Sequence, residues 1–376
     1  MRNRFLVGAI AGVAAASGLL VLAPGAMASG PQALTEVVHR WRDISPQPGS
    51  KASAEPLSSV FCFASGKCLA VGNRGNAIIS RFWTGTHWSG RYSGHPNEMV
   101  AASCATASSC MAVGQIEVGH ELLAAAEHWD GTSWSMQQIV LPVSATYAFM
   151  DGVSCPAANS CIAIGGYLAG KQPFIPIAER WNGKRWAMQI IPGPPRKTFA
   201  SFAALSCPAV RSCVAVGMYQ RGAFGETWNG ARWKAQLIPQ PSQATAEPDA
   251  VSCTSATSCL TVGGDNEGAA FAAHWNGRKW GEVPPITPKA GSLDTELRGV
   301  SCASATDCEA VGHTADAAGI LAELWNGKKW FVQRTAAFNG GGLGGVSCLT
   351  PVNCIAVGSR AGNDTTPSLL LALRYS

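Results

Sequence analysis

Seven short segments of the chain alternate large aliphatic side chains with Cys, Ala or Gly. In the first segment Leu69 and Val71 alternate with Ala70 and Gly72, and the second, Met111–Gly114, repeats the pattern. A period of two residues predicts a β-strand. Because neither face of these strands is polar, we expect each strand to be covered on both sides, as in a blade packed between two neighbours.

Each segment begins at the second cysteine of a Cys-x5-Cys pair, and a glycine follows four residues later. The first cysteines recur 42, 51, 52, 46, 49 and 46 residues apart. An internal repeat with a period near 48 residues is typical of propeller blades. The 14 cysteines pair as Cys62 with Cys68, Cys104 with Cys110, Cys155 with Cys161, Cys207 with Cys213, Cys253 with Cys259, Cys302 with Cys308, and Cys348 with Cys354.

A second motif, Trp-Asn/Asp-Gly-x-x-Trp, follows six of the seven alternating segments, at residues 129–134, 181–186, 228–233, 275–280 and 325–330, with a weaker copy at 83–88. Asn-Gly and Asp-Gly supply the positive φ angles of tight hairpin turns. Each repeat therefore predicts four antiparallel strands. Strand a ends at the first cysteine, strand b begins at the second, strand c precedes the Trp motif's turn, and strand d follows it.

The two ends of the chain complete the last repeat. Residues 369–375 match strand c, with Tyr375 in the Trp position, but no strand d follows. Residues 38–44 around Trp41 resemble a strand d, so pairing the termini would close the ring and cover two exposed edges. We predict an all-β fold, a seven-bladed β-propeller of four-stranded antiparallel blades whose ring is closed by an N-terminal strand in the last blade.

The first 28 residues have the three parts of a secretory signal peptide: a basic start, an apolar stretch and an Ala-x-Ala site ending at Ala28. An uncleaved membrane anchor is the alternative. No second apolar stretch of spanning length follows. We therefore expect a signal peptide at 1–28, one propeller domain at 29–376, and a secreted, extracytoplasmic monomer with no membrane span after cleavage.

The charge balance excludes some partners. The chain carries a net charge of +5, which falls to +3 without Arg2 and Arg4, and it has no basic run. This gives no electrostatic case for binding nucleic acid or anionic lipid. An exported protein with an even cysteine count is expected to form disulfides, and each local pair would contribute at most ~2.4 kcal/mol.

Neither a metal site nor a cofactor is predicted. Zinc sites combine close cysteine pairs with a second ligand pair, whereas each pair here stands alone. The histidines also occur singly, at His39, His87, His95, His120, His128, His274 and His313. The sequence contains no nucleophile elbow, phosphate loop or dinucleotide fingerprint, and this favours a protein without catalytic activity.

Three groups of residues have alternative interpretations. The repeated tryptophans favour packing between blades, although one aromatic site per blade would also suit a multivalent lectin. Glu127, Glu179, Glu226 and Glu323 recur two residues before a tryptophan, and we expect them to make a structural hydrogen bond. Glu309 replaces an apolar residue of strand b and is either partnered, directed to solvent or functional.

The complete unit, Ser-Cys-x5-Cys-x-Ala-Val-Gly followed by Trp-Asn-Gly-x-x-Trp, resembles a group of secreted bacterial repeat proteins over essentially the whole mature chain. These proteins look like seven-bladed β-propellers related to the Asp-box and kelch types. The strict Asp-box order Ser-x-Asp-x-Gly-x-Thr-Trp is absent here. The resemblance implies the architecture and no defined activity.

The loops between strands b and c differ from blade to blade, whereas the a–b and c–d turns on the opposite rim are nearly constant. Binding residues tend to lie on variable loops held by a rigid scaffold. We therefore predict a binding surface for an extracellular glycan or protein, with a carbohydrate-active enzyme or multivalent lectin as the alternative. Its candidate residues are Arg74, Glu121, Tyr219, Arg221, Asp265, Glu267, His313, Arg360 and Asp364.

Overall fold

The computed structural model describes residues 40–46, 57–63, 66–74, 77–92, 97–194, 199–241, 244–285, 295–314, 319–335, 341–360 and 369–376. All of these residues belong to one compact unit. The expected signal peptide and its boundary at residue 28 lie outside them, so cleavage stays a prediction.

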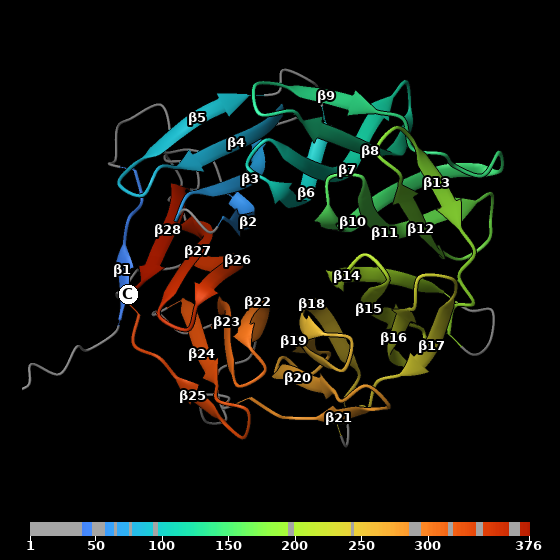
Figure 1. Cartoon of the computed structure of the whole chain (residues 1–376). Coiled ribbons are helices and arrows are strands. Elements are labelled where there is room, and N and C mark those ends of the chain that lie inside the picture. The colour runs from blue at the N-terminus through green and yellow to red at the C-terminus, as the bar shows by residue number, and fades with distance from the viewer. Residues whose placement is uncertain are drawn as a thin grey trace, which may run out of the picture. The chain divides into compact units, whose positions relative to one another are not determined.

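Seven four-stranded antiparallel sheets stand around a central channel (Figure 1), and no helix occurs in the described part of the chain. This arrangement confirms the predicted seven-bladed propeller. We number the blades 1 to 7 by their cysteine pairs. The innermost strands, a, are β2 (Leu57–Cys62), β6 (Asn97–Thr106), β10 (Ala145–Ala157), β14 (Ala200–Ala209), β18 (Ala246–Ser255), β22 (Glu296–Ser304) and β26 (Gly341–Thr350).

The remaining strands follow outward in each blade. The second strands, b, are β3 (Cys68–Arg74), β7 (Ser109–Val118), β11 (Ser160–Ala169), β15 (Ser212–Tyr219), β19 (Ser258–Asp265), β23 (Asp307–His313) and β27 (Asn353–Arg360). The third strands, c, are β4 (Ala77–Trp83), β8 (Glu121–Trp129), β12 (Ile175–Trp181), β16 (Gly222–Trp228), β20 (Ala270–Trp275), β24 (Ile320–Trp325) and β28 (Leu369–Tyr375). The outer strands, d, are β5 (Trp88–Tyr92), β9 (Trp134–Gln137), β13 (Trp186–Gln189), β17 (Trp233–Leu237), β21 (Trp280–Glu282), β25 (Trp330–Val332) and β1 (Trp41–Asp43).

The hydrophobic core lies between neighbouring blades. Met111 and Val113 on one face of β7 pack with residues of blade 3 such as Met150. On the other face, Ala112 packs in a cluster with Leu69 of blade 1. Strand b is therefore covered on both sides, which is why most of its buried residues are apolar.

The cysteine hairpin is present in every blade, as predicted. Each pair forms a disulfide that links strands a and b of one blade, and no cysteine of the described residues is free. The seven bridges are Cys62 to Cys68, Cys104 to Cys110, Cys155 to Cys161, Cys207 to Cys213, Cys253 to Cys259, Cys302 to Cys308, and Cys348 to Cys354. The bridges follow the repeat, so its phase was read correctly from the sequence.

The Asn-Gly hairpin is also present. In the c–d turn of blade 4, the Oδ1 atom of Asn229 accepts hydrogen bonds from the backbone N–H groups of Ala231 and Arg232, each at 3.0 Å. Gly230 supplies the required positive φ angle of 90°. The motif recurs because one side chain and one glycine together fix the turn.

The tryptophans pack between blades. Trp186 and Trp330 are 1% and 2% exposed. Trp330 Nε1 donates to the carbonyl oxygen of Val283 in the preceding blade at 2.8 Å, and Trp134 Nε1 donates to Ser80 Oγ at 3.2 Å. These contacts support the packing interpretation, because a residue that recurs at a blade interface joins one sheet to the next.

Blade 7 is built from both ends of the chain, as predicted. Strand β1 pairs antiparallel with β28, and Trp41 lies opposite Tyr375. Trp41 Nε1 donates to Gln333 Oε1 at 2.6 Å, and Gln333 Nε2 donates to Glu309 Oε1 at 2.8 Å. Glu309 is only 2% exposed, so this partner in blade 6 accounts for a carboxyl group at an apolar position.

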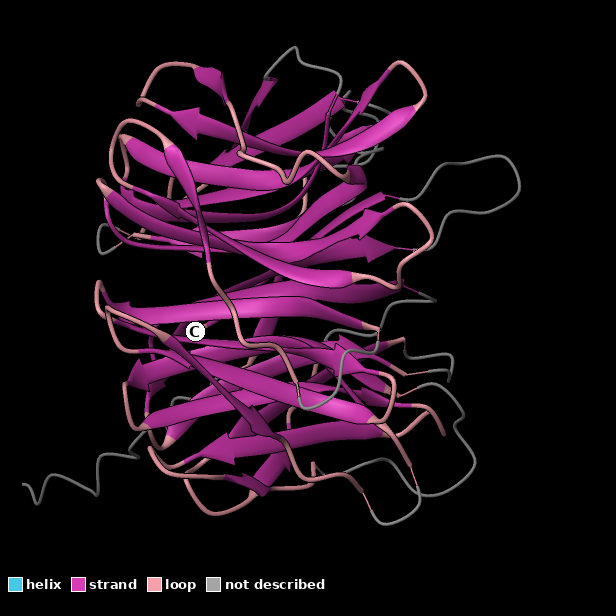
Figure 2. Ribbon diagram, turned by 90° about the vertical axis from the view of Figure 1, so that its right-hand side faces the viewer, coloured by secondary structure: helices cyan, strands magenta, loops and turns pink. Residues whose placement is uncertain are grey.

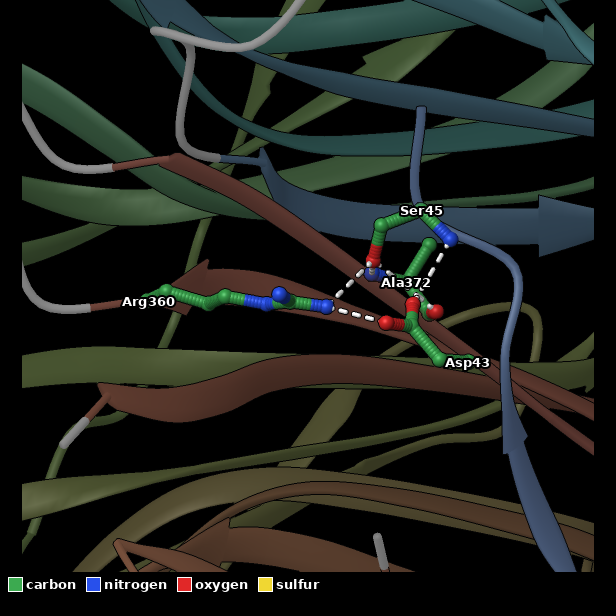
Figure 3. A network of polar contacts seen from close by, with 4 residues as sticks. All are labelled: Asp43, Ser45, Arg360 and Ala372. Atoms are coloured by element: carbon green, nitrogen blue, oxygen red, sulfur yellow. Dashed lines mark hydrogen bonds and ion pairs between the residues drawn. The ribbon is translucent and has the colours of Figure 1, made fainter. Parts of the chain in front are cut away.

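A second polar network holds the residues that follow β1 (Figure 3). Ser45 Oγ accepts a hydrogen bond from the Ala372 N–H at 2.9 Å, and Ile44 N donates to the Ala372 carbonyl oxygen at 2.9 Å. Arg360 at the end of β27 forms an ion pair with Asp43. The closing strand is thus fixed to blade 7 by side chains as well as by its backbone.

A serine before the first cysteine connects neighbouring blades. Ser154 Oγ, for example, accepts a hydrogen bond from the Cys207 N–H of the next blade at 3.0 Å. The same contact joins blade 7 to blade 1, where Ser347 Oγ accepts from Cys62 N at 3.0 Å. The other four join Ser103 to Cys155, Ser206 to Cys253, Ser252 to Cys302 and Ser301 to Cys348.

The propeller has two unlike faces. Strands run across the thickness of the ring between two sets of loops (Figure 2). We call the side with the a–b and c–d turns the turn face. The loop face carries the b–c loops and the linkers that enter the next strand a. The order of strands in each sheet places the start of every strand a on the loop face.

Candidate functional site

The innermost strand of every blade contains a β-bulge at the same position. Pairing between strands a and b skips one residue, four positions before the first cysteine. Bulges turn a side chain out of the regular alternation and are common next to functional sites. We call these residues the bulge ring: Ser58, Val100, Asp151, Ala203, Asp249, Arg298 and Gly344.

The repeated glycine of strand b makes room for this bulge. A Cβ atom at Gly312 would overlap the carbonyl oxygen of Glu296, two residues before Arg298. At Gly263 it would overlap the carbonyl oxygen of Glu247 in the same way, two residues before Asp249. The glycine recurs because only hydrogen fits where the bulged strand approaches.

The bulge ring surrounds the channel. A cavity of about 380 Å³ inside the channel is lined by all seven bulge-ring residues. A second cavity of about 810 Å³ lies at the loop-face end, beside the start of β2, β22 and β26. We call it the mouth cavity. Both cavities border Ser58, Val100, Asp249, Arg298 and Gly344. The ring therefore lies where the channel opens onto the loop face.

Ionisable groups of blades 5 and 6 meet in the mouth cavity. Arg298 Nε donates to Glu296 Oε2 at 2.7 Å, and His313 Nδ1 lies 3.8 Å from the same oxygen. Burial and the hydrogen bond to Glu296 raise the pKa of Asp249 to about 8. Burial opposes ionisation of Glu296, but the hydrogen bond from Asp249 and the Arg298 guanidinium together lower its pKa. Asp249 therefore keeps its proton at neutral pH and shares it with an ionised Glu296.

Blade 3 contributes a different environment to the ring. Asp151 has no hydrogen-bond partner or ion pair recorded within the described residues, and burial raises its pKa to about 7. It borders a further cavity of about 270 Å³ together with Glu98 and Gln115 of blade 2. Gln115 Nε2 donates to Glu98 Oε2 at 2.7 Å, and Tyr147 OH lies 3.4 Å from Gln115 Oε1.

Half-buried aromatic rings lie beside this cavity on the loop face. Phe149 and Phe174 have ring centroids 5.4 Å apart, and both contact Tyr147 at 5.8 Å. Phe174 also contacts Phe199 in the linker to blade 4 at 5.8 Å. All four rings meet edge to face, the arrangement that aromatic quadrupoles favour. Tyr147 and Phe149 therefore line the smaller cavity at blades 2 and 3, whereas the ionisable groups of blades 5 and 6 border the mouth cavity.

The sequence-predicted candidates lie at the ends of strands b and in the b–c loops. Among the candidates whose side chains the structure describes, His313 borders the mouth cavity. Glu121 is exposed at the start of β8, and Arg221 and Glu267 are exposed in turns. Tyr219 packs against Phe224, with ring centroids 6.3 Å apart.

Other candidates support the fold locally. Asp265 Oδ1 accepts hydrogen bonds from Glu267 N at 3.0 Å and Ala269 N at 2.9 Å, which caps the loop of blade 5. Arg360 is paired with Asp43 of the closing strand. Arg74 ends β3, and Asp364 lies outside the described residues. A role in binding stays a prediction for all nine residues.

Sequence reasoning missed Asp151, Asp249, Glu296 and Arg298. A signal for three of them was available, because aligning the chain on its cysteines places Asp151, Asp249 and Arg298 in one column. The column appears unremarkable, since its other members are small or apolar. Only the bulge shows that its side chains face the channel.

Across the described ranges, no group of three or more His, Cys, Asp or Glu side chains could hold a metal ion. The same ranges contain no helix long and apolar enough to cross a membrane.

No family model matches the chain, and no curated protein matches it. Among solved structures, the chain is similar to "YCF48 bound to D1 peptide", with 16% identity and a TM-score of 0.56 over 90% of this chain and 96% of that one. It is also similar to YCF48 from Cyanidioschyzon merolae, with 13% identity and a TM-score of 0.55 over 89% and 98%. At these identities the likeness establishes the fold alone.

Proposed function

We propose that the protein is a non-catalytic propeller that acts outside the cytoplasm and binds a segment of polypeptide at the loop-face mouth. The observation that carries this proposal is the bulge ring. Seven equivalent positions surround one opening, yet only three of them are ionisable, and the lining of the mouth cavity contains residues of blades 1, 2, 5, 6 and 7 but none of blades 3 and 4. A repeated scaffold with one irregular opening suits a single ligand.

The proposed location rests on two observations. The first 28 residues have the pattern of a secretory signal peptide, and all seven cysteine pairs form intrachain disulfides. Such disulfides persist in oxidising compartments. Because each bridge closes within its own blade and no cysteine of the described residues is free, no disulfide would join two chains, and we expect a secreted monomer.

A polypeptide fits the mouth better than the two alternatives. The mouth combines aromatic rings, donors and acceptors of both charges, which are the groups that contact peptide side chains and backbone. One similar propeller was solved with a peptide bound. A multivalent lectin would need equivalent sites around the ring, whereas the bulge ring differs from blade to blade. A glycosidase holds its two carboxyl groups at least about 5 Å apart, whereas Asp249 and Glu296 are hydrogen-bonded.

Photo-crosslinking tests the proposal. A benzophenone-bearing amino acid replaces Val100, which borders all three cavities of the mouth and channel. The matched control replaces Val210, which is 39% exposed in an a–b turn on the turn face. We expect protein crosslinks from position 100 in the medium or envelope of the source cells and none from position 210. Crosslinks from position 210 alone, or retention of the protein by a glycan array with several equivalent sites per chain, would contradict the proposal.

A further inference from the structure

The bulge ring contains three ionisable residues, two acidic and one basic, which are distributed unevenly around the channel. Asp151 lies in blade 3, and Asp249 and Arg298 lie in blades 5 and 6. Going round the ring, blades 3 and 6 are separated by two blades in one direction and by three in the other. The remaining members, Ser58, Val100, Ala203 and Gly344, are small or apolar and leave the space between them open.

Arg298 presents donors to the channel. Its Nε atom donates a hydrogen bond to Glu296 Oε2 at 2.7 Å, and this contact orients the guanidinium. Within the described residues, no partner is recorded for its terminal nitrogens, and the side chain is 55% exposed. A guanidinium held in this way offers two parallel N–H groups to a carboxylate.

The two neighbouring carboxyl groups leave the terminal nitrogens of Arg298 available to bind a ligand. Asp249 shares its proton with Glu296, so these two carboxyl groups carry about one negative charge between them at neutral pH. That charge balances Arg298, and His313 faces the same Glu296 oxygen. Glu247 adds a further negative charge near Asp249, while the donors of Arg298 stay exposed on the blade 5–6 side of the mouth.

The opposite side has acceptor character. The carboxyl group of Asp151 points into the channel from the bulge and has no hydrogen-bond donor recorded within the described residues. Glu98 borders the same small cavity, with Gln115 as its hydrogen-bond donor. Asp151 is half-buried, and a partly desolvated carboxyl group gains from an added cation because the cation offsets the cost of removing its charge from water.

The geometry points to a ligand segment that carries both charges, and this inference rests on the proposed function. A carboxylate of the bound polypeptide meets Arg298, and a lysine, arginine or amino-terminal group of the same segment meets Asp151. The small bulge-ring residues let the backbone pass between the two contacts. The channel thereby distinguishes mixed-charge segments from purely acidic or purely basic ones.

An array of synthetic decapeptides tests the inference with the intact secreted protein as the probe. One acidic and one basic residue are placed in a Gly/Ser background at separations of one to seven residues, which span ~3–25 Å in extended chains. Acid-only, base-only and uncharged peptides complete the array. We expect retention of mixed-charge peptides at one preferred separation, with at least a tenfold advantage over the other classes.

Two variants assign the contacts. Arg298→Gln should bind mixed-charge peptides more weakly, because the acidic residue of the peptide has lost its partner, and should bind base-only peptides as weakly as the wild type does. Asp151→Asn should also bind mixed-charge peptides more weakly, but its weak binding of acid-only peptides should be unchanged. Arg211→Gln and Asp307→Asn on the turn face are the matched controls and should bind like the wild type. Thermal melting of each variant separates loss of binding from loss of folding, and Arg298→Lys should restore part of the binding.

The outcomes distinguish the inference from the proposed function. The inference is overturned if uncharged peptides are retained as well as mixed-charge peptides, and if neither charge variant changes this retention. Peptide binding itself would still hold if a bulky Val100→Trp substitution blocked the retention. Retention of no peptide of any class overturns both. If each variant loses the binding of every peptide class, the assignment of the peptide's acidic residue to Arg298 and of its basic residue to Asp151 is also contradicted.

Discussion

The outer strands and the inner strands of the blades obey different rules. At the outer edge the two tryptophan rings of each Trp motif pack with centroids 5.4–5.7 Å apart, and Trp186 and Trp330 are buried in equivalent places. At the inner edge the backbone recurs, including the bulge, but the bulged side chain changes from Gly344 to Arg298. Repetition of a residue therefore marks a packing requirement, whereas repetition of a backbone position with varied residues marks a place open to function.

The largest expected effect comes from breaking the one blade that is not continuous in sequence. Deleting residues 32–46 removes Trp41 and the backbone pairing of β1 with β28. We expect the free energy of unfolding to fall by more than the ~3–5 kcal/mol of a single Trp→Ala change. Denaturant titration measures the loss, and a deletion variant as stable as the intact chain would contradict closure by the termini.

A single outer tryptophan should cost less. Trp186→Ala removes a side chain that is 1% exposed, and we expect a loss of ~3–5 kcal/mol. Met188→Ala on the same strand is the control, because Met188 is 50% exposed and should change stability by no more than ~0.5 kcal/mol. Equal losses at both positions would mean that the outer strand does not depend on its repeated residue.

Repeated glutamates of strand c give the structure a pH dependence. Glu226 Oε1 accepts from the Gly193 N–H in the linker from blade 3 at 2.8 Å, which confirms the expected hydrogen bond for this residue. Glu179 is fully buried, and no partner is recorded for either carboxyl oxygen within the described residues. Burial raises the pKa of Glu179 to about 8 and that of Glu226 to about 7.

Because the folded pKa of Glu179 is raised above its ordinary value of 4.5, its contribution to stability is complete below that value and is lost as pH rises toward 8. We expect Glu179→Gln to be close to wild type at about pH 5 and more stable by roughly 1–3 kcal/mol at about pH 9. Exposed Glu282→Gln is the control. A difference between Glu179→Gln and wild type that does not change with pH would show that Glu179 has a partner in solution.

The smallest effect is expected at the bulge ring. Ala203→Gln in blade 4 directs a polar side chain into the channel and should change the free energy of unfolding by less than ~1 kcal/mol. Ala215→Gln in the neighbouring strand β15 places the same side chain in a fully buried position and should prevent stable folding. Comparable losses for the two variants would refute the distinction between packing positions and ring positions.

Blade number, hairpins and ring closure were accessible from the sequence because each depends on a residue that recurs. Seven cysteine pairs fix the phase of the repeat, and Trp41 supplies the missing member of the tryptophan series. The partner of Glu309 was not accessible, since Gln333 directly follows the outer strand of the same blade and approaches Glu309 only once the sheet has formed.

The site was less accessible for a physical reason. Alternation assigns each strand residue to one face, but a bulge shifts that assignment by one, so Asp151 and Arg298 do not follow the pattern on which the strands were recognised. The sequence predicted a binding role for b–c loop residues such as Glu121 because these loops vary in both length and sequence. The bulge-ring residues vary within a strand of constant length, which hides them among scaffold positions.

Blade 7 also determines how the protein would respond to mechanical force. Strands β1 and β28 are antiparallel, and Arg40 N lies 3.4 Å from the Ser376 carbonyl oxygen, so both chain ends leave the same end of the pair. Pulling on the termini would load the hydrogen bonds one after another, as in opening a zipper, rather than all at once in shear. The ring would open at low force. Each disulfide would then keep the seven residues that it encloses from extending as the chain unfolds. A tether that pulled on the two ends would therefore separate β1 from β28 before any other blade lost its strand pairing.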